Sequence, residues 1–107
     1  MGTSIHIARD FSPYPVGRYK PEGPFTGEVF RETLLRPALE KGPVELVFDD
    51  VMGLPPSFLE EALGGLVRSG FRVEDLERLL TIRATNPRMK LHPERAWMFI
   101  RHASSGR

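Results

Sequence analysis

The stretch that decides the fold is VELVFDDVMGLPPSFLEEALGGLV, residues 44–67. Its first seven residues are mostly apolar, which is typical of a central strand that is covered on both faces. After two prolines, apolar residues recur at helical spacing and form a stripe suited to packing on a sheet: Leu59, Ala62, Leu63, Leu66 and Val67. A central strand followed by an amphipathic helix predicts an α/β domain.

The start of this helix carries a recognisable capping pattern. Ser57 is followed three residues later by Glu60, which is the spacing of a capping box. We therefore expect Ser57 to N-cap the helix over residues 58–69. The same helical phase predicts that Glu61, Gly64 and Arg68 point outward.

Two adjacent glycines, Gly64 and Gly65, stand in the middle of the helix. Each costs a helix about 0.5–1 kcal/mol relative to alanine, so we expect a compensating contact. A glycine lets a neighbouring backbone approach closely. That neighbour is either another part of this chain or a partner, and the sequence leaves both readings open.

The remaining elements follow from periodicity and punctuation. Residues 4–9 alternate as a strand does, and the proline-rich segment that follows holds a possible short strand at 16–19. A helix over 28–41 is expected to be capped by Thr26 or Gly27, kinked at Pro37 and stopped by Gly42. Residues 71–80, 80–85 and 92–105 predict a short helix, a strand and a final helix. The prediction is a single domain over 1–107, with a mixed sheet of about four strands covered by helices.

Composition excludes several classes of protein. The 107 residues include 15 Lys and Arg against 14 Asp and Glu, and this balance argues against a nucleic-acid binder. The absence of cysteine excludes disulfides and thiolate chemistry. No secretory signal and no apolar run long enough for a membrane span is apparent. The expectation is a soluble cytoplasmic protein without a membrane partner.

The sequence gives little support for an enzyme. No nucleophile–base set, Walker or dinucleotide loop, or zinc pattern is present, so we expect no catalytic residue, cofactor or metal. Asp49 and Asp50 precede the helix that carries Glu60 and Glu61, and such carboxylates suit Mg²⁺. Capping of the turn and the helix is the favoured interpretation of these acids.

Four residues of the N-terminal segment are candidates for binding: Arg9, Asp10, Arg18 and Tyr19. The arginines can pair internally with Asp10 or Glu60, which is the favoured interpretation. They can also present a guanidinium fork to an anionic group.

Several runs resemble a known family. ARDFSPYPVGRY, GPFTGEVFRETLLRPALEKG, VELVFDDVMGLPPSFLEEALGGLVRSGF and LTI, within residues 4–83, resemble the STAS-like family of unknown function. That family is related to the STAS domains of bacterial anti-sigma factor antagonists. The resemblance implies helices packed on a sheet and an interaction surface at the turn before the second helix.

The same resemblance bears on phosphorylation. In anti-sigma factor antagonists this turn reads Asp-Ser-Ser/Thr-Gly, and a partner kinase phosphorylates the first serine. Here Pro55 stands at the aspartate, Pro56 at that serine, Ser57 at the second hydroxyl and Phe58 at the glycine. The hydroxyl that carries the switch is therefore absent in this alignment, whereas an alignment shifted by one residue would make Ser57 the acceptor.

The functional expectation is a non-catalytic interaction module. It would bind a protein partner through loop 51–57, with Pro56 and Ser57, and through the outer face of helix 58–69. The resemblance implies a kinase-like or regulatory ATPase as partner, and the chain itself as a monomer or homodimer. The alternative is a sensor of a small anion or nucleotide, which would use the positive end of helix 58–69 with Arg9 or Arg18.

Overall fold

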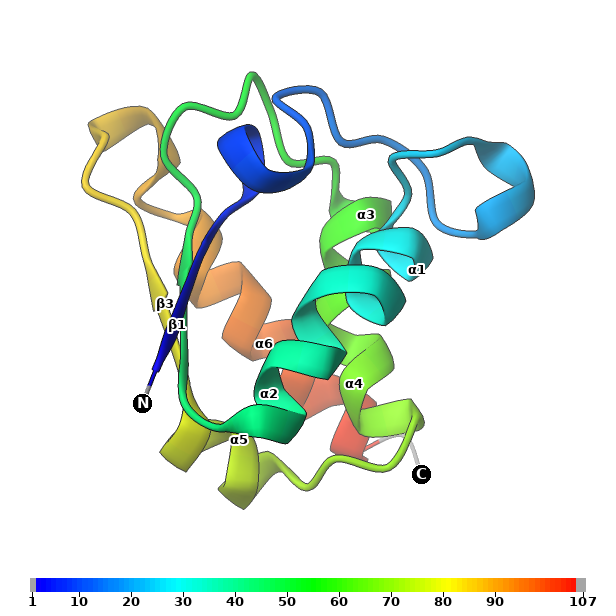
Figure 1. Cartoon of the computed structure of the whole chain (residues 1–107), viewed down its shortest axis with the longest axis vertical. Helices are drawn as coiled ribbons and strands as arrows, with labels where there is room; N and C mark the ends of the chain where they lie inside the picture. The colour runs from blue at the N-terminus through cyan, green and yellow to red at the C-terminus, as the bar shows by residue number, and fades with distance from the viewer. Residues whose placement is uncertain (1, 106–107) are drawn as a thin grey trace.

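The computed structural model describes residues 2–105 and shows a three-stranded sheet with helices packed against it (Figure 1). The elements, in chain order, are β1 (Thr3–His6), η1 (Ile7–Phe11), η2 (Lys20–Glu22), α1 (Gly27–Phe30), η3 (Arg31–Leu35), α2 (Arg36–Lys41), β2 (Val44–Val47), α3 (Pro56–Leu59), η4 (Glu60–Gly64), α4 (Gly65–Arg68), α5 (Val73–Leu79), β3 (Leu80–Arg83), η5 (Pro87–Met89) and α6 (His92–Ser105).

The sheet differs from the prediction in strand number and direction. Its order is β1-β2-β3, and both strand pairs are parallel. Ile5, Leu46 and Ile82 stand side by side in register. The expected mixed sheet of about four strands is therefore wrong, although the central position of β2 is confirmed.

The helices lie on one side of this sheet (Figure 1). Crossovers between parallel strands are right-handed in nearly all proteins. Because β1, β2 and β3 follow one another in the same direction across the sheet, both crossovers then fall on the same face. Val44 and Leu46 of β2 point into the resulting core.

The opposite face of the sheet is largely polar, so the expectation that β2 is covered on both faces holds at Val47, which is 1% exposed, but not at Glu45. Glu45 accepts a hydrogen bond from the Ser4 hydroxyl at 3.3 Å and pairs with the exposed Arg83 at 3.0 Å. Thr81 is also exposed there. These side chains let the uncovered face contact water.

Residues 16–19 do not form the expected strand. Gly17 has a φ of 95°, a left-handed conformation that interrupts an extended segment. The Gly17 carbonyl accepts from Gly27 N–H at 3.0 Å, and the Arg18 carbonyl accepts from Glu28 N–H at 3.0 Å. These carbonyls therefore satisfy the start of a helix instead of a strand ladder.

The helix over Gly27–Lys41 has most of the features predicted for it. Thr26 is its N-cap, with its hydroxyl accepting from Val29 N–H, and Gly42 follows its end. Ahead of Pro37 the helix widens into the π-helical turn η3, where Arg36 N–H donates to the Arg31 carbonyl. The disruption expected at the proline takes this form, since Pro37 has no N–H to donate.

The second long helix runs through α3, η4 and α4 and is buried along most of its length. The predicted apolar stripe is buried as expected, but Glu61 and Gly64 are buried as well. A Cβ added to Gly64 would lie 3.3 Å from the Phe99 carbonyl of α6. The expected outer face is thus largely absent, because α6 packs against it.

Candidate functional site

Large apolar side chains gather in two loops at the carboxyl end of the sheet. The loops are joined by a hydrogen bond from Met52 N–H to the Pro13 carbonyl at 2.8 Å, and they lie side by side at the top of Figure 1. Tyr14, Val16 and Met52 are 65%, 62% and 59% exposed. We call the hollow that they line the loop patch: Tyr14, Pro15, Val16, Met52, Gly53 and Pro55.

The loop patch has a defined support beneath it. Phe11 lies 5.1 Å from the Phe30 ring and 6.2 Å from the Phe58 ring, centroid to centroid. The buried Ser12 hydroxyl accepts from Tyr14 N–H at 2.9 Å. These contacts fix the backbone at residues 11–14, so Tyr14 is exposed on an ordered loop.

This concentration of exposed apolar residues is unusual within the molecule. Among the described residues, seven large hydrophobic side chains are exposed, and five belong to the segment 14–25 or to Met52. The other two are Leu91 and Met98. Contiguous apolar surface of this kind marks a protein-interaction site more often than scattered exposed residues do.

Sequence reasoning placed the interface at loop 51–57 but missed Tyr14, Val16 and Met52 individually. A signal was present, because large apolar residues between prolines have no helix or strand face on which to be buried. Periodicity could not show that the two loops meet. That contact depends on the bond between Met52 and Pro13.

The N-terminus of the second helix is not capped as predicted. Pro55 is the N-cap residue and Pro56 the first helical residue, and no side chain caps this end. Ser57 is therefore the second helical residue and its hydroxyl does not form the expected capping box. Proline suits the first helical position because its φ is already helical, which shifts the helix start ahead of Ser57.

The two prolines also reduce the capacity of this helix end to bind an anion. A helix normally leaves four backbone N–H groups free at its start. Here Pro55 and Pro56 have none, and Leu59 N–H already donates to the Pro55 carbonyl at 3.0 Å. Only the N–H groups of Ser57 and Phe58 remain to meet a ligand.

A network of charged side chains joins this helix to the rest of the molecule. Glu61, 6% exposed, accepts from Arg31, 8% exposed, at 2.8 Å. Arg18 pairs with Glu60, as the sequence analysis favoured, and lies 3.4 Å from Glu61. Arg68 pairs with Glu60 at 2.6 Å. We call these five residues the ion network.

Hydrogen bonding dominates the charge state of Glu60. Burial raises the pKa of this carboxyl, but hydrogen bonds from Arg68 and Arg18 outweigh burial and hold the pKa below its ordinary value. Burial likewise lowers the pKa of Arg31, while Glu61 and Glu32 raise it above its ordinary value. The ion network thus joins three guanidinium groups to two carboxylates, and Glu32, which pairs with Arg31 at 2.9 Å, supplies a third carboxylate.

The glycines serve this internal packing. A Cβ on Gly65 would collide with the Arg31 guanidinium, and one on Gly64 would lie 2.5 Å from the Glu60 carboxylate. Both glycines make room for the ion network. The neighbour left open in the sequence analysis is thus the chain itself, and Glu61 and Gly64 are not accessible to a partner.

Arg9 and Asp10 form the internal pair that the sequence analysis favoured. Arg9 Nε lies 3.1 Å from Asp10 Oδ1, and His6 N–H donates to Asp10 Oδ2 at 2.8 Å. The hydrogen bonds from Arg9 and then His6 lower the Asp10 pKa. Tyr19, by contrast, is half exposed beside Arg18, whose guanidinium lies 6.0 Å from its ring centroid.

The carboxylates after β2 have separate roles. Asp49 accepts from Thr85 N–H at 2.9 Å, Asn86 N–H at 2.8 Å and the Thr85 hydroxyl at 2.7 Å, so it holds the segment after β3. Asp50 is exposed, with a φ of 72°. Within residues 2–105, no group of three or more His, Asp or Glu side chains could hold a metal ion.

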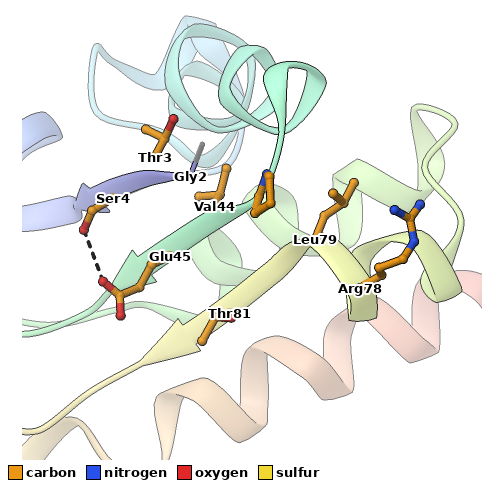
Figure 2. A pocket seen from close by; sticks show the side chains of 9 residues that line it. Gly2, Thr3, Ser4, Val44, Glu45, Arg78, Leu79 and Thr81 are labelled. Carbon is orange, nitrogen blue, oxygen red and sulfur yellow. Dashed lines mark hydrogen bonds between the residues drawn. The ribbon is translucent and has the colours of Figure 1, made fainter.

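A second hollow lies at the opposite end of the sheet (Figure 2). Three of the polar side chains that line it, Ser4, Glu45 and Arg78, already have partners. Ser4 donates to Glu45 at 3.3 Å, as the dashed line shows, and Arg78 pairs with Asp75 at 3.2 Å. Because these polar groups already have partners, this hollow is a weaker candidate for a binding site than the loop patch.

A family model described as "STAS-like domain of unknown function (DUF4325)" matches residues 26–90, which is more than half of the chain. The chain belongs to this family. No curated protein and no solved structure is detectably similar to it. In this STAS-like domain, loop 51–57 lies inside the matched region and residues 13–19 precede it. None of the helices described here is long and apolar enough to cross a bilayer.

Proposed function

We propose that this STAS-like domain is a non-catalytic regulatory module that binds a protein partner at the loop patch. The observation that carries the proposal is the exposure of Tyr14, Val16 and Met52 on two loops joined by a backbone hydrogen bond. Burying such apolar area yields roughly 25 cal/mol per Å². A partner that covers these side chains would therefore gain binding energy without a large rearrangement of the domain.

The partner class rests on the likeness to anti-sigma factor antagonists. By that likeness the partner is a kinase-like or regulatory ATPase. The proposed interface keeps loop 51–57 and adds residues 13–19, while the buried face of the second helix is left out. Arg18 and Arg68 both pair with Glu60, Tyr19 lies beside Arg18, and Arg68 is partly exposed.

The alternative of an anion or nucleotide sensor has weaker support. Arg9 and Arg18 both have carboxylate partners. Two of the four N-terminal N–H positions of the helix are prolines. An anion would therefore compete with existing ion pairs at a site with few donors.

Site-specific photo-crosslinking in the source cells tests the proposal. A photoreactive side chain at position 52 is compared with one at position 91, since Met52 and Leu91 are similarly exposed at 59% and 64%. We expect a discrete protein adduct from position 52 that is lost when Tyr14→Asp is also present. An adduct of equal yield from both positions, or from position 91 alone, would contradict the proposed interface.

A further inference from the structure

Asp50 has an unusual backbone conformation at the border of the loop patch. With a φ of 72°, it is the one non-glycine residue with positive φ among those described. Val51 is fully buried between the exposed Asp50 and Met52. Asp50 and Met52 therefore both lie on the outer side of the same turn.

The conformation alone does not explain an acidic side chain at this position. Glycine adopts this region without cost, and asparagine tolerates it about as well as aspartate does. Across residues 2–105, no hydrogen bond or ion pair engages the Asp50 carboxylate. The negative charge of Asp50 thus has no partner among the described residues, whereas Asp10 and Asp49 both have partners.

The surroundings of Asp50 are negative. A shallow hollow beside it is lined by His6, Ala8, Arg9, Asp49 and Asp50. Asp10 pairs with Arg9, and Asp49 accepts hydrogen bonds from Thr85 and Asn86, so among these three carboxylates that of Asp50 is left without a partner in the described part of the chain. A positively charged group is the natural complement of this border.

The size of the loop patch limits what can cover it. Three aromatic or aliphatic side chains that are about 60% exposed offer roughly 300–400 Å². A stable dimer buries about 800 Å² on each partner. The patch is therefore too small to hold a second copy of the chain by itself, and suits a short segment of another protein.

We infer that the partner segment carries an apolar side chain that covers the loop patch and an adjacent lysine or arginine that pairs with Asp50. This inference rests on the proposed function and names the chemistry of its partner. The apolar contact supplies most of the affinity. The ion pair at the rim supplies specificity and association rate, and salt weakens it.

A peptide selection tests the inference with a defined probe. A library of random twelve-residue peptides displayed on phage is selected on the full chain at low salt, and the best clone is synthesised. We expect it to contain a large apolar residue beside a lysine or arginine. Asp50→Asn should weaken its binding about three- to tenfold, and Met52→Asp should abolish measurable binding.

Matched controls separate these effects from general ones. Glu94→Gln removes another exposed carboxylate, and Leu91→Asp adds a charge at another exposed apolar residue; neither should change binding. Changing the basic residue of the peptide to glutamine should make Asp50→Asn silent, as a double-mutant cycle requires. Asp50→Gly, which suits the positive φ, should match Asp50→Asn, and melting temperatures confirm that both variants fold.

The outcomes distinguish this inference from the proposed function on which it rests. Peptides that depend on Met52 but not on Asp50, or that are acidic, would overturn the basic-segment inference and leave the loop patch as a docking site. Selected peptides indifferent to Met52→Asp, or no selected peptides, would overturn both.

Discussion

Proteins usually bury apolar side chains and expose charged ones. The loop patch and the ion network each depart from one half of this rule. The loop patch exposes large apolar residues, whereas the ion network buries charged ones. Buried charges are tolerated only when they are paired, and here Arg31 and Glu61 pair with each other. The exposed apolar residues have no comparable compensation inside the molecule. The comparison indicates that the ion network serves the fold, and it supports the proposal that the loop patch serves a partner.

The largest expected effect on stability comes from breaking the ion network. Glu61→Ala leaves the buried Arg31 guanidinium without its main partner, which should cost about 3–5 kcal/mol. Urea unfolding measures this loss. Glu32→Ala removes the more exposed partner of Arg31 and should cost clearly less. A loss below about 1 kcal/mol for Glu61→Ala would show that the buried pair is not structural.

The next largest effect is expected where the two long helices touch. A Cβ on Gly27 would lie 2.5 Å from the Phe58 carbonyl and 3.0 Å from the Ala62 backbone nitrogen. Because backbone atoms cannot move aside as a flexible side chain can, Gly27→Ala should cost about 1–3 kcal/mol. Gly53 has open space around its Cβ position, so Gly53→Ala is the thermal-melting control and should be nearly neutral. Equal effects at both positions would contradict this packing.

A smaller effect is expected in the pH dependence of unfolding. The Glu60 pKa is lower in the folded chain than its ordinary value of 4.5, so the unfolded state binds the proton more readily. The resulting stabilisation is complete above pH 4.5 and is lost as the pH falls through the lowered value. Glu60→Gln should flatten the dependence of unfolding free energy on pH below 4.5. An unchanged slope in Glu60→Gln would contradict the assignment.

The smallest of these stability effects is expected at Ser57. Loss of a capping serine costs about 1 kcal/mol, which is the result that the sequence pattern predicts. Since Pro55 is the N-cap residue and no side chain caps this end, Ser57→Ala should instead change the melting temperature by less than about 2 °C. A drop of 4 °C or more would restore the capping box.

The sequence predicts the helices and strands better than it predicts which of their residues are buried by tertiary packing. A run of mostly apolar residues correctly identifies β2, and apolar periodicity correctly identifies the helix after it and α6. Periodicity fails at Glu61, which lies outside the apolar stripe yet is buried against Gly27 and Arg31, two residues that are distant in the sequence. It also fails at Ser57, where two prolines compete with the capping pattern for the helix start.

The sequence predicts where the candidate site lies but not all of the residues that form it. Loop 51–57 follows the central strand, and this position favours a binding surface in open α/β sheets. Tyr14 and Val16 join it through a contact between segments about forty residues apart, which no local pattern encodes. Gly17, whose conformation prevents a strand at 16–19, helps to keep that segment a loop.

The central claim is that the loop patch binds a partner and contributes little to the fold, and Met52→Asp tests it most directly. Its melting temperature and its binding to the partner identified by crosslinking are measured together, beside the wild type. The account predicts a melting temperature within about 2 °C of the wild type and loss of detectable partner binding. A drop of several degrees with partner binding retained would contradict it.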